Sequence, residues 1–150
     1  MTGEGAEQAD DLRGAGSGGR SSPRSGFDHR STGRVVFHIA FASDWNVAQR
    51  VGEYRVSTRG LSLDDVGFIH ASTSRGQTLG VASSFYGDVT EPLVLLCIDV
   101  DRVGSEVRDE LVGVAPVPFP HVYGPIPVPS VTVVAELRRG ADGAFVWPLA

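Results

Sequence analysis

The chain contains the run Leu93-Val94-Leu95-Leu96-Cys97-Ile98, in which all six side chains are apolar. A strand that is buried on one face alternates apolar and polar residues, whereas a continuous apolar run fits a strand covered on both faces. Pro92 precedes the run and the turn-forming stretch Asp99–Gly104 follows it. Residues 92–100 are therefore predicted to form the central strand of the fold.

Weaker patterns predict the elements around this strand. One helix is expected to begin with Ser43 as its N-cap and to end at Gly52. A second helix is expected to be capped by Ser72 or Thr73 and to end at Gly87. Strands are predicted at residues 35–39, 54–56, 67–71, 106–114, 130–137 and 144–147. This order predicts an α+β fold, with about two helices packed on a largely antiparallel sheet.

Two segments have unusual composition. Residues 1–33 contain eight Gly, five Ser and six apolar side chains, too little apolar surface to offset the entropy of ordering them. We therefore expect a disordered leader over 1–33 and one compact domain over 34–150. Residues 115–129 are rich in proline but also in apolar side chains, so a packed loop is expected there rather than a linker.

The net charge of −5 argues against non-specific nucleic-acid binding, which requires a clustered basic surface. A small anionic ligand is still compatible with it, because one or two arginines can hold a phosphate. Cys97 is the single cysteine, so no internal disulfide can form. The chain shows neither a secretory signal nor 18 consecutive apolar residues, so we expect no membrane span and a cytoplasmic location. The sequence leaves the oligomeric state open.

Three histidines stand in short motifs at predicted strands. His38 lies in Phe37-His38-Ile39, His70 follows Gly67-Phe68-Ile69, and His121 lies in the proline-rich segment. A single strand histidine is more often a core residue whose hydrogen bonds are satisfied than a ligand. Imidazole is nevertheless the side chain best suited to acid–base work near neutral pH. We predict that His38, His70 and His121 form one pocket and act as its catalytic residues.

Polar residues near the histidines are predicted to contact a ligand. Ser72 and Thr73 offer hydroxyls and backbone N–H groups that can bind an anion, although simple helix capping uses the same groups. Tyr123 is held by neighbouring prolines and can either line the pocket or fill the core. Arg108 and Glu110 share one face of an extended segment. Arg108 is predicted to contact the ligand and Glu110 to be a catalytic carboxylate. The alternative is that the two residues form a surface ion pair.

Two more specific functions are less well supported by the spacing of the histidines in the sequence. Three imidazoles and a water can hold a catalytic zinc ion, but no two of the histidines have close ligand spacing, so no metal site is predicted. His70-Ala71-Ser72 fits the His-x-Ser element of two-histidine phosphoesterases. That chemistry requires a second copy, which neither His38 nor His121 supplies.

Four motifs in register resemble the bacterial family known as domain of unknown function 952. Its members carry a Tyr-His-Ile-like start, a Gly-Phe-Ile-His-Cys-Ser-like centre, a Leu-Val-Leu-Leu-like strand and a Phe-Pro-His-Leu-Tyr-Gly-Pro-Leu-like loop. The corresponding residues here are 37–39, 67–72, 93–96 and 119–126. The resemblance extends from Arg34 to Trp147.

This resemblance implies a split-sheet fold related to the ADP-ribosyltransferases, including the NAD-dependent RNA 2′-phosphotransferases. His38 matches the place of a residue that contacts the NAD ribose, and His70 resembles the counterpart of a residue on the nicotinamide side. Glu110 matches an Arg-aromatic-Glu pattern, but Asp109 stands where the aromatic residue is expected. The sequence alone names no cofactor, and NAD is the one that the resemblance implies.

Two hypotheses of different classes follow from the sequence. The first is an enzyme that binds a small nucleotide-like ligand, such as NAD or ADP-ribose, and carries out ADP-ribosyl or phosphotransferase-type chemistry. The second is a non-catalytic regulatory module that binds a ligand or a peptide in the same pocket. An acid–base pair within hydrogen-bond reach would favour the enzyme, whereas widely separated histidines would favour the module.

Overall fold

A computed structural model describes residues 31–150 of the chain, and the predicted leader falls almost entirely outside this range. All strand pairs in residues 31–150 are antiparallel, as the sequence predicted. No helix in this part of the chain has the length and apolar character needed to cross a bilayer.

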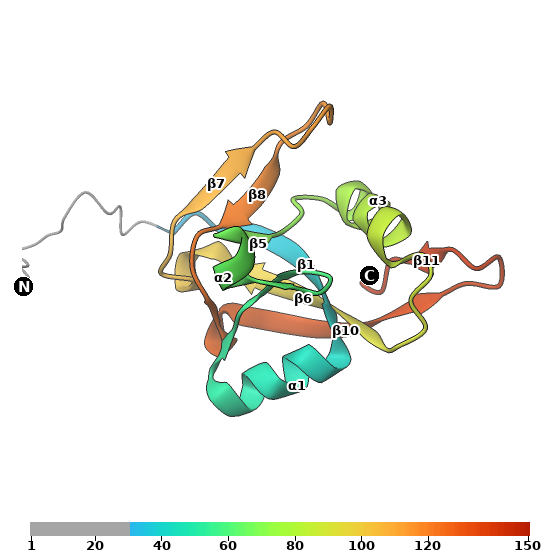
Figure 1. Cartoon of the computed structure of the whole chain (residues 1–150), viewed down its shortest axis with the longest axis horizontal. Coiled ribbons are helices and arrows are strands. Elements are labelled where there is room, and N and C mark those ends of the chain that lie inside the picture. Colours follow the sequence, from blue (N-terminus) through green and yellow to red (C-terminus); the bar gives the residue numbers. More distant parts are fainter. Residues whose placement is uncertain (1–30) are drawn as a thin grey trace, which may run out of the picture. The chain divides into compact units, whose positions relative to one another are not determined.

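The main sheet has four strands in the order β1-β6-β10-β11. The predicted central strand is indeed central, because β6 pairs with β1 on one side and with β10 on the other. Its side chains from Leu95 to Ile98 are all buried. Figure 1 shows β6 between its two neighbours. The four strands are β1 (Val35–Phe41), β6 (Leu93–Asp99), β10 (Val131–Arg139) and β11 (Phe145–Val146).

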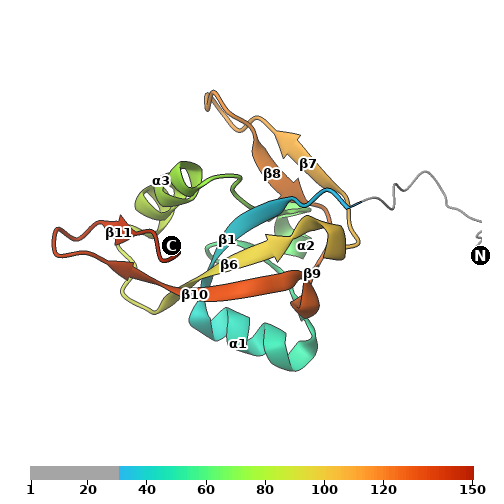
Figure 2. The same ribbon diagram turned by 180° about the vertical axis from the view of Figure 1, so that it is seen from behind.

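Each face of this sheet has its own hydrophobic cluster, because successive side chains of a strand point to opposite faces. The first cluster joins Val36, Ala40 and Leu96 to residues of α1 (Ala42–Val51) and of the smaller sheets. The second joins Ile39, Leu93 and Leu137 to α3 (Arg75–Tyr86). Figure 2 shows the two helices from behind, α1 running beside the sheet and α3 near β11. The sheet therefore lies between two hydrophobic cores and contributes side chains to both.

A second sheet of three strands positions the candidate site. Its order is β5-β8-β7, where β5 is Ile69–His70, β8 is Phe119–Val122 and β7 is Val107–Glu110. Ile69 and Val122 pair across it and are fully buried in the first cluster. Backbone hydrogen bonds between Phe37 and Ser72 join this sheet to β1. Two short pairs complete the fold: β2 (Glu53–Tyr54) with β9 (Ile126–Pro127), and β3 (Val56–Thr58) with β4 (Leu61–Ser62).

The structure corrects the predicted helices in number and in their caps. A third, short helix, α2 (Leu63–Val66), lies between the strands predicted at 54–56 and 67–71, and Ser62 and Asp65 form a capping box at its start. Helix α1 follows β1 directly and begins after Phe41, so Ser43 is not its cap. Ser74 caps α3 in place of Ser72 or Thr73. Ser72 cannot act as the cap, because its backbone pairs with Phe37 of β1.

The proline-rich segment is packed from Phe119 onward, as expected, whereas residues 116–118 are exposed, contrary to the prediction. The packed part contains regular structure that the prolines concealed. Residues 119–122 form β8, the middle strand of its sheet, and residues 128–130 form a 3-10 turn. Pro120 stands inside β8, where its missing N–H would normally exclude it. It contributes its carbonyl oxygen instead, which accepts a 3.0 Å hydrogen bond from the Ala71 N–H. The strand predicted at 106–114 is shorter than expected and ends at Glu110.

The central position of β6 generates a stability prediction. Leu96 is fully buried and pairs with Val134 of β10, which is 43% exposed. Leu96→Ala should lower the free energy of unfolding by about 2–5 kcal/mol, because it leaves a cavity between the sheet and α1. Val134→Ala, at the paired position, should cost less than about 1 kcal/mol. Urea unfolding of both variants measures the difference, and equal losses would contradict the deeper burial of β6 relative to β10.

Candidate functional site

One face of the β5-β8-β7 sheet brings together most of the predicted site residues. His121 of β8 lies opposite His70 of β5 and Arg108 of β7, so their side chains share a face. Residues two positions along each strand point the same way. The face therefore carries Phe68, His70, Arg108, Glu110, Phe119, His121 and Tyr123. The opposite face holds Ile69 and Val122 in the core.

Glu110 organises one end of this face. Its Oε1 atom lies 2.7 Å from the Nδ1 atom of His121 and accepts a 2.5 Å hydrogen bond from the Tyr123 hydroxyl. The hydrogen bond from Tyr123, followed by that from His121, lowers the pKa of Glu110 below its usual value. The same contact raises the pKa of Tyr123. At neutral pH, Glu110 is therefore a carboxylate that holds two neighbours in place.

The Glu110 carboxylate determines the tautomer of His121 and, through His121, that of His70. Glu110 can only accept, so His121 donates from Nδ1, and a neutral His121 then has a lone pair on Nε2. The Nδ1 atom of His70 lies 3.4 Å from that Nε2 atom, a long contact in which His70 is the donor. A neutral His70 consequently has its lone pair on Nε2. This atom is buried and has no hydrogen-bond partner in residues 31–150.

Both imidazoles are held by aromatic neighbours. The ring of Phe68 stacks on His121 with centroids 4.0 Å apart, and the ring of Phe119 lies 4.8 Å from that of His70. Burial lowers the pKa of His70 to about 4, with a smaller effect from His121. His70 is therefore uncharged at neutral pH, and its free lone pair can accept a proton.

Arg108 and Tyr123 form the more exposed end of the face. The Arg108 guanidinium lies over the Tyr123 ring, 4.3 Å from its centroid, and donates a 3.0 Å hydrogen bond to Glu106. Half of the Arg108 side chain is exposed, so this cation is accessible to an anionic group. Gly124 follows Tyr123 and passes so close to Ser105 that a Cβ atom would lie 2.1 Å from the Ser105 hydroxyl oxygen. Any larger residue at position 124 would therefore force Ser105 to move.

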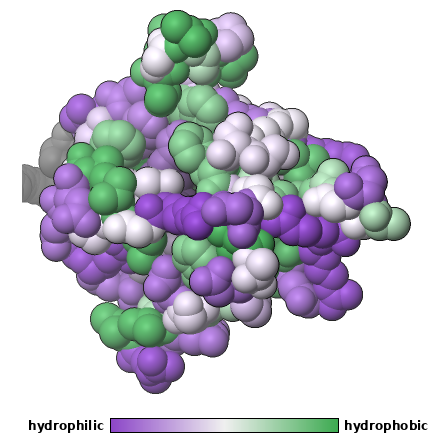
Figure 3. Space-filling view, turned by 45° about the vertical axis from the view of Figure 1, so that its right-hand side comes forward, coloured by the Kyte–Doolittle hydropathy of each residue, from purple (hydrophilic) through white to green (hydrophobic). Residues whose placement is uncertain are grey.

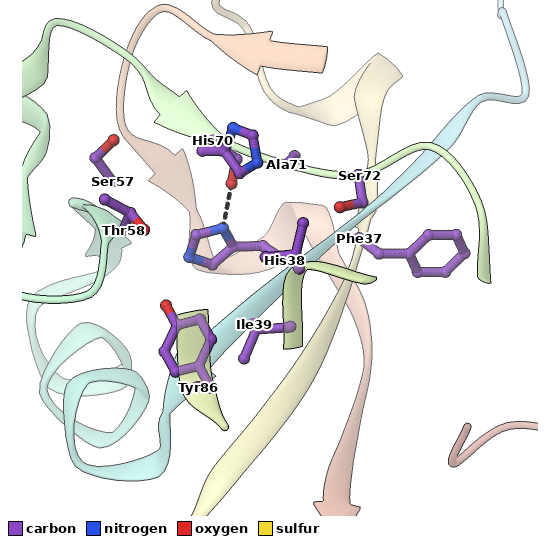
Figure 4. Close-up of a pocket in the computed structure, with 10 residues that line it drawn as sticks. Phe37, His38, Ile39, Ser57, Thr58, His70, Ala71, Ser72 and Tyr86 are labelled. Carbon is purple, nitrogen blue, oxygen red and sulfur yellow. Dashed lines mark hydrogen bonds between the residues drawn. The ribbon is translucent and has the colours of Figure 1, made fainter. Parts of the chain in front are cut away.

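His38 lies in a different environment. Its Nδ1 atom donates to the His70 carbonyl oxygen at 2.5 Å, and its Nε2 atom accepts from the Tyr54 hydroxyl at 2.9 Å. Figure 4 shows the His38 ring directed at that carbonyl oxygen. Burial lowers the pKa of His38 to about 4. With both nitrogens engaged and the side chain buried, His38 fixes the backbone of β5 in this structure.

A small cavity lies beside His38 rather than between the three histidines. His38, His70 and Ser72 border it together with residues such as Tyr86 (Figure 4), but His121 does not. Its volume of about 10 Å³ has room for the centre of one water molecule. The structure thus places His70 between two clusters instead of forming one three-histidine pocket.

The remaining predicted residues have simple local roles in the structure. Thr73 is exposed, and its N–H donates to the side-chain oxygen of Gln77 at 2.7 Å, so this N–H is not free for an anion. In residues 31–150, no three His, Cys, Asp or Glu side chains are arranged to hold a metal ion. Sequence reasoning did not identify Tyr54 or Gln77 as partners of the site. Phe68 had a usable signal, because it is two residues from His70 on the same strand.

These features define a small α+β protein with a histidine–carboxylate site on an antiparallel sheet. The family model described as protein of unknown function DUF952 matches residues 39–134, and the chain belongs to this family. A crystal structure of protein CC0527 from Caulobacter crescentus is 29% identical, covers 75% of this chain and 93% of its own, and has a TM-score of 0.61. A solution NMR structure of CC0527 is 30% identical over 73% and 90% of the two chains, with a TM-score of 0.57. No curated protein matches the chain.

The two depressed histidine pKa values predict a loss of stability in mild acid. His38 and His70 have pKa values of about 4 when folded, against 6.5 when unfolded, so only the unfolded chain gains protons as the pH falls below 6.5. Above pH 6.5 these histidines do not change the free energy of unfolding. By pH 4, each should lower it by about 3 kcal/mol. Urea unfolding at a series of pH values measures the slope.

The variant His70→Gln provides the control for this pH dependence. It removes one of the two titrating imidazoles and retains a side-chain N–H that can donate towards His121. The slope of stability against pH between 6.5 and 5 should therefore fall to about half of the unaltered value. An unaltered chain whose stability is constant over that interval would show that the buried imidazoles are not held in their neutral form.

Proposed function

We propose that this protein is an enzyme in which His70 is the general base and a nucleotide-like molecule is the substrate. One observation carries the proposal: the chain Glu110–His121–His70 ends at a buried imidazole nitrogen that has a lone pair and no partner in residues 31–150. Buried polar atoms are almost always hydrogen-bonded in folded proteins, so such an atom suggests that a reacting group occupies this position during function.

The three residues have different roles in this proposal. His70 accepts a proton at Nε2, and His121 takes up part of the resulting positive charge through the His70 Nδ1–H. Glu110 does not reach the substrate, because its hydrogen bonds go to His121 and Tyr123. It is a positioning residue that holds the tautomer of His121 and stabilises a protonated imidazole. This role differs from the catalytic carboxylate that the resemblance implies.

A nucleotide suits the surroundings of His70. Phe119 and Tyr123 supply flat rings for stacking, and the accessible guanidinium of Arg108 supplies a charge for a phosphate. A phosphate that binds Arg108 would replace its hydrogen bond to Glu106. The family resemblance supports NAD or ADP-ribose in particular. His38, which the resemblance assigns to the ribose, would first have to release Tyr54.

The reaction that best combines these features is ADP-ribosyl transfer. The oxygen of an acceptor hydroxyl attacks C1 of the ribose, and the bond between the ribose and nicotinamide breaks with its electron pair going to nicotinamide. The hydroxyl proton passes to His70 Nε2. Burial keeps His70 uncharged at neutral pH, so the lone pair on its Nε2 atom is available to this proton. A relation of the fold to the ADP-ribosyltransferases is part of the same proposal.

The second candidate is a non-catalytic binding module, and one observation favours it. The cavity that His70 borders holds no more than about one water molecule, and His70 Nε2 is buried. A ligand would then bind on the exposed Arg108–Tyr123 end of the sheet without reaching the imidazole. The two candidates differ in the role of His70, which takes part in turnover in the enzyme and does not contact the ligand in the binding module.

Kinetic analysis of three variants separates these candidates. With NAD at millimolar concentration, His70→Gln should lower nicotinamide release by about 10²–10⁴-fold, because the proton acceptor is lost. Glu110→Gln should lower it by about 10–100-fold, since only the positioning of His121 is affected. Asp109→Asn, on the same strand but paired with Arg34, should leave turnover unchanged. Chromatography of the released nicotinamide gives the rates.

Calorimetric titration with NAD and ADP-ribose completes the test. Binding without turnover that is unchanged by His70→Gln would establish the binding module and refute the enzyme. Neither binding nor turnover at millimolar ligand would refute the nucleotide-like substrate for both candidates. Thermal unfolding of each variant shows whether a lost activity reflects lost folding.

A further inference from the structure

Gln77, in the first turn of α3, joins two elements that are far apart in the sequence. Its side-chain oxygen accepts a 2.7 Å hydrogen bond from the Thr73 N–H, and its side-chain nitrogen donates a 3.1 Å hydrogen bond to the Pro118 carbonyl. Pro118 is the last residue before β8. The cap of α3 is a separate interaction, in which the Ser74 hydroxyl accepts from the Gln77 N–H. The Gln77 amide therefore ties the helix to the base of the β7–β8 hairpin.

The residue after Pro118 covers the proposed base. Phe119 packs its ring against that of His70, with the centroids 4.8 Å apart. His70 is partly exposed as a residue, yet its Nε2 atom is buried. A buried atom is closed to a substrate, and Phe119 is the residue of the hairpin whose ring contacts this imidazole.

The end of the hairpin, residues 111–118, extends into solvent. Its exposed apolar side chains form the hydrophobic cluster at the top of Figure 3 and are Leu111, Val112, Val114 and Val117, with exposed fractions from 44% to 102%. Because these side chains pack little against the protein, a movement of the hairpin end would lose little buried surface. Within it, the Ala115 N–H donates to the Val112 carbonyl at 3.0 Å, so the turn can move as a unit.

We infer that residues 111–119 form a hinged cover over His70, and that the Gln77–Pro118 hydrogen bond holds this cover closed. The hinge lies where the pairing of Glu110 with Phe119 ends the two strands. Opening breaks the Gln77–Pro118 hydrogen bond, the ring contact of Phe119 with His70 and the last strand pair, that of Phe119 with Glu110. The interactions of Glu110 with His121 and Tyr123 lie on the strand side of the hinge and remain in place. The inference gives the proposed function of His70 its means of substrate access.

The variant Gln77→Glu tests the latch selectively. Glutamate retains an oxygen that can accept from the Thr73 N–H, and its charge is favourable in the first turn of a helix. It cannot donate to the Pro118 carbonyl, so the cover should open more often. Diethylpyrocarbonate, which reacts with uncharged imidazole nitrogens, reports the exposure of His70 at pH 7. We expect Gln77→Glu to speed modification of His70 about five-fold, measured by peptide mass spectrometry.

Ser74→Ala is the matched control. It removes the cap of the same helix and leaves the side-chain amide of Gln77 intact, so it should not change the rate at His70. An equal increase in both variants would mean general loosening of α3 and would overturn the latch. An unchanged rate in Gln77→Glu would also overturn the latch. Unaltered protein whose His70 reacts as fast as a free histidine peptide would overturn the cover itself. The reagent needs no substrate, so failure of this test differs from failure of the proposed enzyme.

Discussion

The requirement to cover β6 on both faces organises the whole domain. A strand with apolar side chains on both faces is stable only if each face of its sheet is buried, and here α1 with the small sheets covers one face and α3 covers the other. This arrangement fixes β1 beside β6 with alternate residues in the two clusters. His38 consequently lies on the same face as Val36 and Ala40, where burial leaves it two polar partners, Tyr54 and the His70 carbonyl.

His70 connects the interior of the protein to the candidate site. Its carbonyl oxygen accepts from His38, whereas its imidazole contacts His121 on the face that points away from the core. The backbone of β5 is thus held from within, and the side chain is oriented from the other direction by Glu110 through His121. Burial keeps His38 and His70 uncharged, because an imidazolium in a poorly hydrated site is unfavourable. The result is a neutral base in a fixed orientation.

In the proposed enzyme, the sheet that orients His70 also restricts access to it. β7 and β8 carry Glu110 and His121, and beyond them the chain continues as the apolar hairpin end. The strands are anchored by the buried pair Ile69 and Val122, while the hairpin end depends on contacts such as that of Gln77 with Pro118. For the proposed enzyme, this arrangement lets a path to His70 open while Glu110 and His121 stay in place.

The sequence by itself determined the elements whose signals are local. The apolar run at 93–98 predicted β6, Gly52 marked the end of α1, and the apolar residues among the prolines predicted the packing of residues 119–128. Several site residues were also identifiable, since histidine, tyrosine and glutamate stood in motifs. Their partners were not. The contact of His121 with Glu110, and the separation of His38 from both, depend on the register of strands far apart in the chain, which only the packing around β6 decided.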